Sequence, residues 1–80
     1  MMRIEIEYFA ILREQAGKEH EFVETTAMTP AQLFAQLSTQ YGFALNNASL
    51  RVAVNDQFCD WSDSLAEGDR VVFIPPVAGG

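Results

Sequence analysis

The sequence has few of the residues on which several large classes of protein depend. It contains a single cysteine, Cys59, so no internal disulfide can form, which is typical of a reducing compartment. One cysteine is also too few to hold an iron–sulfur cluster. No apolar run approaches the roughly 20 residues needed to cross a bilayer, and no secretory leader pattern is present. We therefore expect a cytoplasmic protein without a membrane partner.

Basic residues are also scarce. Five Lys and Arg stand against eleven Asp and Glu, which gives a net charge of −6. Because nucleic-acid phosphates would be repelled by such a surface, nucleic acid is excluded as a partner. The charge favours proteins with basic docking faces. The hydrophobic content of 49% is typical of a folded globule, and 80 residues allow one small domain.

Acidic residues are dense in the last third of the chain. They are Asp56, Asp60, Asp63, Glu67 and Asp69. Their spacing does not match a calcium-binding loop, so we expect turn formers and negative surface and no metal site. Asp56, Asp60 and Asp63 are expected to raise the pKa of the Cys59 thiol, which argues against a persulfide carried there.

Hydrophobic periodicity predicts the first elements. Residues 3–9 alternate strictly and indicate a strand, with Ile4, Ile6 and Tyr8 on one face. Residues 10–16 are expected to form a short helix ended by Gly17, and residues 20–23 a second strand.

The second half of the chain gives a stronger helix signal. Thr29 as N-cap, Pro30 at the first helical position and Gln32 completing a capping box begin a helix that Gly42 ends. Three short strand segments are expected next: residues 51–54 form the first, Asn55-Asp56 turn it towards Phe58, and residues 70–74 form the last. One main helix must then cover a single mixed sheet. This order predicts an α+β protein with a β-grasp, ubiquitin-like roll over residues 1–75.

The chain ends in two glycines after a pair of prolines. Pro75 and Pro76 lack backbone donors, so a strand must end there and the exit of the chain is stiffened. Gly79 and Gly80 place the terminal carboxylate on a backbone without side chains, which can thread a narrow channel. We predict a flexible tail over residues 76–80, with Gly80 as the reactive end and Gly79 giving it access.

An apolar patch is expected beside this tail. Phe9 falls on the face opposite Ile4, and Ile74 points away from the core if Phe73 points into it. The predicted partner-binding residues are Phe9, Ile74, Pro75, Pro76 and Val77. The alternative is that Phe9 folds back onto the short helix and that Ile74 is an ordinary half-buried strand residue.

Three segments resemble a known family. They are Phe9-Ala10-x-x-Arg13-Glu14, Ala53-Val54-Asn55, and Leu65-x-x-Gly68-Asp69-x-Val71-x-Phe73-x-Pro75-Pro76-Val77-x-Gly79-Gly80. The pattern is similar to the MoaD family, the small sulfur-carrying subunits of molybdopterin synthase. The final segment is the specific one.

The resemblance implies a carrier that is not catalytic alone and binds no cofactor stably. A ubiquitin-activating-type adenylyltransferase would use ATP and magnesium to adenylate Gly80, and a sulfur donor protein would convert the adenylate to a thiocarboxylate. The tail would then enter the large synthase subunit and give its sulfur to a cyclic pyranopterin, forming the molybdopterin dithiolene.

Two alternatives share the fold and the Gly-Gly end. A sulfur carrier for thiamine-type biosynthesis tends to lack the Phe-Ala-x-x-Arg-Glu segment and the Pro-Pro exit. A ubiquitin-like modifier would join Gly80 to lysines of target proteins, and isopeptide adducts would mark it. An autonomous enzyme is disfavoured because no nucleophile–base pair is visible.

Overall fold

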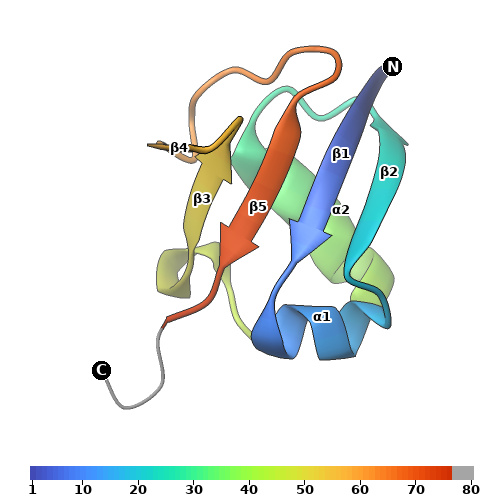
Figure 1. Cartoon of the computed structure of the whole chain (residues 1–80), viewed down its shortest axis with the longest axis vertical. Helices are drawn as coiled ribbons and strands as arrows, with labels where there is room; N and C mark the ends of the chain where they lie inside the picture. The colour runs from blue at the N-terminus through green and yellow to red at the C-terminus, as the bar shows by residue number, and fades with distance from the viewer. Residues whose placement is uncertain (77–80) are drawn as a thin grey trace.

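The computed structural model describes residues 1–76, which form one five-stranded mixed sheet with a helix across one face (Figure 1). The strand order is β2-β1-β5-β3-β4; β1 and β5 are parallel and the other neighbours antiparallel. The elements are β1 (Met2–Tyr8), α1 (Ala10–Ala16), β2 (His20–Thr25), α2 (Pro30–Tyr41), the short 3-10 helix η1 (Asn47–Ser49), β3 (Arg51–Val54), β4 (Gln57–Cys59) and β5 (Arg70–Ile74).

Strand β1 follows the predicted alternation. Ile4, Ile6 and Tyr8 are buried in the core, whereas Glu5 and Glu7 are only half-buried. Because side chains alternate across a strand, the two glutamates lie on the face of the sheet that the core does not cover. This uncovered side is called the open face below.

Helix α2 begins and ends where the sequence predicts. The Thr29 hydroxyl oxygen accepts from the Gln32 N–H at 3.2 Å, and Gly42 ends the helix in the left-handed conformation, with a φ of 70°. The Gln32 side chain departs from the expected capping box. Its oxygen accepts from the Met28 N–H at 2.8 Å, one residue before the N-cap, and so ties the incoming loop to the helix.

Aromatic rings join α2 to the strand that precedes the tail. Phe34 of α2 packs edge-on against Phe73 of β5, with ring centres 5.1 Å apart, and Trp61 stacks on Phe73 at 5.9 Å. Phe73 is fully buried. Aromatic pairs of this kind add about 0.5–1.5 kcal/mol beyond the area they bury. The last strand is therefore fixed in the core up to the residue before Ile74.

The half-buried carboxylate of Glu21 links β1, β2 and α2. Glu21 accepts hydrogen bonds from the Tyr8 and Tyr41 hydroxyls at 2.5 and 2.7 Å, and the Lys18 ammonium lies 3.5 Å from its other oxygen. Burial raises the pKa of Glu21, but the two tyrosine hydrogen bonds and the Lys18 charge outweigh burial, so the pKa is lowered. The local sequence around Glu21 does not indicate this cluster, because the two tyrosines lie 13 and 20 positions away from Glu21 in the chain.

We expect Glu21→Gln to lower the free energy of unfolding by about 1–2 kcal/mol at pH 7, because hydrogen bonds to a charged acceptor are lost. The folded pKa of Glu21 lies below the ordinary value of 4.5, so its stabilisation is complete above that pH and is lost as the pH falls through the folded pKa. Urea unfolding of both proteins between pH 7 and pH 3 should show the difference shrinking. Glu24→Gln, exposed on the same strand, is the matched control; equal losses in both variants would contradict the prediction.

Candidate functional site

Strand β5 carries the chain from the middle of the sheet towards the tail. It pairs with β1 on one side and β3 on the other, and it ends at Ile74. Pro75 is half-buried and Pro76 is exposed, and neither can donate a further backbone hydrogen bond. Sheet pairing therefore stops where the sequence predicts. Val77, Gly79 and Gly80 lie outside the described residues, and the domain boundary at residue 75 stays a prediction.

Phe9 is held at the junction between β1 and α1. It is the N-cap of α1, and its carbonyl accepts from the Leu12 N–H at 3.1 Å. The next residue, Ala10, has a φ of 51°, a left-handed conformation that costs a residue with a Cβ about 1–2 kcal/mol. The Phe9 side chain is 44% exposed. Its strained junction positions an apolar ring at the end of the sheet from which β5 leaves.

Two hollows lie on either side of Ile74. The first, of about 310 Å³, has Phe9 and Ile74 in its walls together with Phe58. The second, of about 420 Å³, is walled by Ile74, Pro75, Pro76 and again Phe58. The structure thus gathers the predicted residues 9, 74, 75 and 76 around the exit of the chain. That a partner binds them stays a prediction.

Phe58 is the residue that sequence reasoning missed. It is 59% exposed and lies in β4, where its Cα partner is Ala53. Ala53 is in turn the partner of Val72, so Phe58 shares the open face with the outward side of β5. The predicted turn at residues 55–56 fixes this register, and following the register across the turn would have placed Phe58 opposite Ala53. Val72 also faces outward, yet it is only 7% exposed because it lies on the central strand.

A charged cluster borders the first hollow. The Arg70 guanidinium lies 2.5 Å from a Glu7 oxygen, 3.0 Å from an Asp56 oxygen and 3.9 Å from a Glu5 oxygen. Such pairs at a partly exposed surface contribute little stability each, but a network holds its members in place. Arg70 therefore offsets part of the negative charge that these three carboxylates place on the open face next to the apolar walls.

Cys59 is half-buried and packs against the core. Burial raises the pKa of its thiol, and the negative charges of Asp63, Asp60 and Asp69 raise it further. Asp56, also expected to act on this thiol, instead pairs with Arg70. A thiol with a raised pKa is mostly protonated at neutral pH and is a poor sulfur nucleophile.

The acidic loop serves local structure. The Asp63 carboxylate accepts from the Asp60 N–H at 3.0 Å, and the Asp69 carboxylate accepts from the Ala66 N–H at 2.8 Å. Within residues 1–76, no three acidic, histidine or cysteine side chains are grouped so that they could hold a metal ion.

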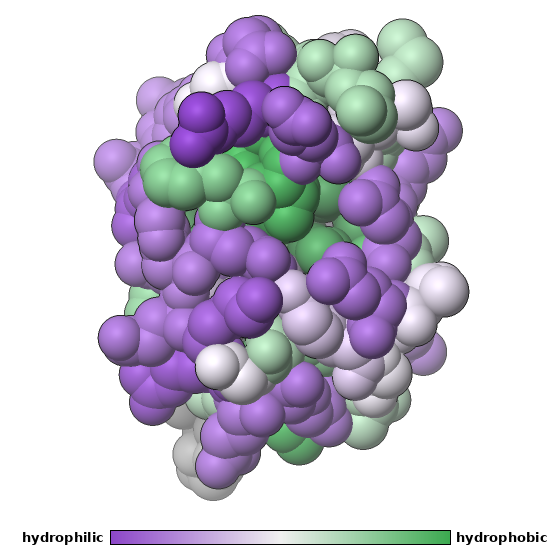
Figure 2. Space-filling view, turned by 90° about the vertical axis from the view of Figure 1, so that its right-hand side faces the viewer, coloured by the Kyte–Doolittle hydropathy of each residue, from purple (hydrophilic) through white to green (hydrophobic). Residues whose placement is uncertain are grey.

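Seen from the β2 edge, the surface is mostly hydrophilic, with a hydrophobic area in its upper half (Figure 2).

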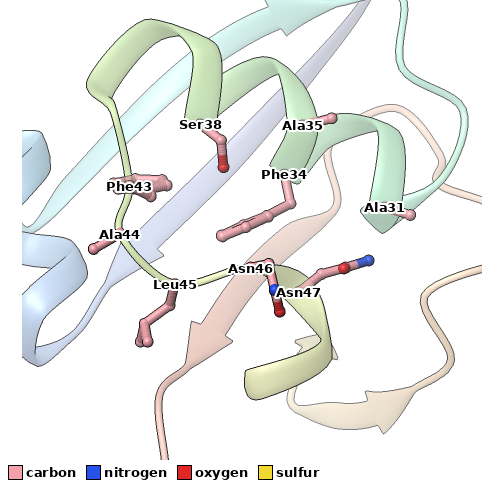
Figure 3. A pocket seen from close by; sticks show the side chains of 9 residues that line it. All are labelled: Ala31, Phe34, Ala35, Ser38, Phe43, Ala44, Leu45, Asn46 and Asn47. Atoms are coloured by element: carbon pink, nitrogen blue, oxygen red, sulfur yellow. The ribbon is translucent and has the colours of Figure 1, made fainter.

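A further hollow of about 320 Å³ lies between α2 and the loop that follows it (Figure 3). Phe34 and Phe43 point into it, and Asn46 and Asn47 lie at its lower edge. Its only hydroxyl is that of Ser38, and its walls contain no titratable side chain. With no base beside Ser38, this hollow offers no means of activating a nucleophile.

In the described part of the chain, neither helix is long and apolar enough to cross a bilayer.

Comparisons with known proteins agree with this geometry. The ThiS family model matches residues 6–80. The molybdopterin synthase sulfur carrier subunit of Escherichia coli is 34% identical over 96% of this chain and 99% of its own, and that of Haemophilus influenzae is 32% identical over 91% and 94%.

Solved structures confirm the predicted β-grasp fold. Caldiarchaeum subterraneum ubiquitin, 18% identical, matches with a TM-score of 0.63 over 99% of this chain and 98% of its own. In Helicobacter pylori, subunit 1 of molybdopterin-converting factor is found in a complex with subunit 2. The matching chain of that complex is 28% identical, with a TM-score of 0.69 over 99% of this chain and 100% of its own. The chain therefore belongs to the ThiS family, as a member of the molybdopterin synthase sulfur carrier subunits.

Proposed function

We propose that this chain carries sulfur as a thiocarboxylate on Gly80 and delivers it inside a large synthase subunit. The observation that carries the proposal is the position of the exit: the central strand ends at Ile74, between two hollows that both have apolar walls, and two prolines follow, the second four residues before the terminal carboxylate. The hollows serve as the docking surface, and the tail reaches beyond it. Four extended residues span at most about 13–14 Å, enough to enter a partner's active site.

The chemistry at Gly80 requires activation by another protein. An α-carboxyl group has a pKa of about 3.3–3.7, so at neutral pH it is an anion and a poor electrophile. An oxygen of this carboxylate attacks the α-phosphorus of ATP, bound with magnesium on the adenylyltransferase, and pyrophosphate leaves. Sulfide (HS⁻) supplied by a donor protein then attacks the acyl carbon, the bond from that carbon to the phosphate oxygen breaks, and AMP leaves. The thiocarboxylate so formed is the nucleophile that reacts with the cyclic pyranopterin in the large subunit.

This chain contributes position rather than catalysis. Cys59, with its raised pKa, is not suited to hold the sulfur. The residues near the exit are apolar side chains, the ion pairs of Arg70 and the Arg51 guanidinium, which can bind a protein surface but include no ATP site. On this proposal the adenylation site and the acid–base groups of both reactions belong to partner proteins.

The intact mass of the protein purified from its own host tests the proposal. Replacing one carboxyl oxygen by sulfur adds about 16 Da. We expect this gain in the wild-type protein and equally in Cys59→Ser, and we expect it to vanish when Gly80 is deleted. A gain that disappears in Cys59→Ser would instead assign the sulfur to the thiol. Adducts joined through Gly80 to lysines, with no thiocarboxylate, would assign the chain to the modifiers.

A further inference from the structure

Arg51 is an arginine at the tail exit whose role the proposed function does not explain. It begins β3, and its Cα partner across the sheet is Ile74, the last residue of β5. Its guanidinium carbon lies 4.0 Å from the centre of the exposed Phe58 ring. A guanidinium stacked on a ring is held in one plane, and the N–H groups at its edge remain able to donate.

Arg51 is not neutralised by an ion pair, in contrast to Arg13 and Arg70. Arg13 pairs with Glu19 at 3.2 Å, and Arg70 pairs with Glu7 and two other carboxylates. Among residues 1–76, no carboxylate oxygen lies within 4.0 Å of a guanidinium nitrogen of Arg51, so Arg51 forms no ion pair there. Asp60 and Asp63 share a separate hollow with it, but the Asp63 carboxylate bonds to the Asp60 N–H.

The hollow beside the tail combines this cation with apolar walls. Arg51 is the one charged residue among those that line it, and Phe58, Ile74, Pro75 and Pro76 supply apolar surface. The hollow on the other side of Ile74 differs, because there Arg70 is matched by Glu7 and Asp56. The hollow beside the tail is thus complementary to a negatively charged group that has an apolar group next to it.

Building on the proposed function, we propose that this hollow binds an aspartate or glutamate side chain of the protein that receives the tail, together with an adjoining apolar residue. A carboxylate can accept two parallel hydrogen bonds from one guanidinium, which fixes orientation as well as contact. Because the net charge of this protein is −6, its surface attracts basic partner surfaces and repels acidic ones. An acidic residue of the partner would therefore bind favourably only beside Arg51, which requires one orientation of the partner. Arg51 would then select the orientation in which the partner's channel faces the tail.

Charge reversal tests this, and the chain offers a matched control. Arg3 also stacks on an exposed phenylalanine, Phe22, at 4.5 Å, but it lies at the start of β1, the end of the sheet opposite Ile74. Arg51→Glu and Arg3→Glu therefore change the net charge and remove a stacked guanidinium alike. We expect Arg51→Glu to weaken binding to the large synthase subunit of the same organism about tenfold or more in calorimetry, and Arg3→Glu to change it less than about twofold.

Exchanging the charge in the partner completes the test. Reversing the contacting acidic residue of the large subunit to arginine should restore binding of Arg51→Glu. Equal weakening by both variants, or wild-type affinity in Arg51→Glu, would overturn this proposal alone. A large subunit that does not bind the wild-type chain would overturn the proposed function and this proposal together.

The chain's own terminal carboxylate is the competing occupant. In the free protein, the side-chain Nε–H signal of Arg51 in nitrogen-15 NMR spectra should be the same in the full chain and in a chain that ends at Pro76 as a carboxamide, which brings no new carboxylate to the hollow. A shift of this signal on truncation would mean that the tail itself occupies the hollow and would overturn the proposal.

Discussion

Deleting Gly80, or adding one alanine after it, is expected to abolish thiocarboxylate formation and molybdopterin synthesis while the melting temperature barely changes. Deletion shortens the reach of the chain by about 3.3–3.6 Å, and the addition converts the native carboxylate into a peptide bond. Displacements near 1 Å can already cost about a hundredfold in rate, so residual activity should be small. The stability of the fold should not change, because the core ends at Phe73.

The assay is dithiolene formation from pyranopterin with the reconstituted carrier, activating enzyme, sulfur donor and large subunit. An alanine added before Met1 is the matched control, since it lengthens the chain and leaves the carboxylate unchanged. Gly79→Ala should be milder than either change unless the channel excludes a methyl group. Synthesis supported by the extended chain, without trimming by a protease, would show that Gly80 is not the sulfur-carrying end.

The second large effect is expected at the docking surface. Ile74→Asp should weaken binding to the large subunit by about 2 kcal/mol or more, because it places an unpaired charge between the two hollows that we propose as the docking surface. Phe9→Ala should weaken binding in the same direction. Both side chains lie outside the core, so the domain should stay folded.

Calorimetry gives the affinity, and far-UV circular dichroism reports the fold. Met28→Asp introduces the same charge at an exposed apolar residue in the loop before α2, and it should leave the affinity nearly unchanged. Unchanged affinity in Ile74→Asp, or a loss of helix and strand signal, would remove Ile74 from the docking surface.

Local signals in the sequence were sufficient to predict the elements of the fold. The alternation in β1, the Thr29 cap and the glycine that ends α2 each act within a few residues, so they can be recognised without knowing the tertiary structure. β2 extends to Thr25, two residues beyond the prediction, and η1 was not predicted. Thr25 is fully buried by tertiary contacts that the sequence does not reveal.

The site was predicted only in part, for the same reason. The prolines and glycines of the tail can be recognised directly in the sequence. The outward direction of Ile74 follows from the alternation of side chains along β5. Phe58 and Arg51 do not, because their importance depends on the pairing of β3 with both β4 and β5. The cluster around Glu21 likewise joins residues up to 20 positions away in the chain.

The parallel pairing of β1 with β5 has a mechanical consequence. A force that draws Gly80 outward while the amino end is restrained would pull these two strands in opposite directions along their length. In that geometry the hydrogen bonds between residues 5–8 and 70–73 bear the load together, instead of opening one after another as in a peeled strand. β3 holds the other side of β5 along the same stretch. The domain should therefore resist unfolding when a force is applied to its carboxyl end.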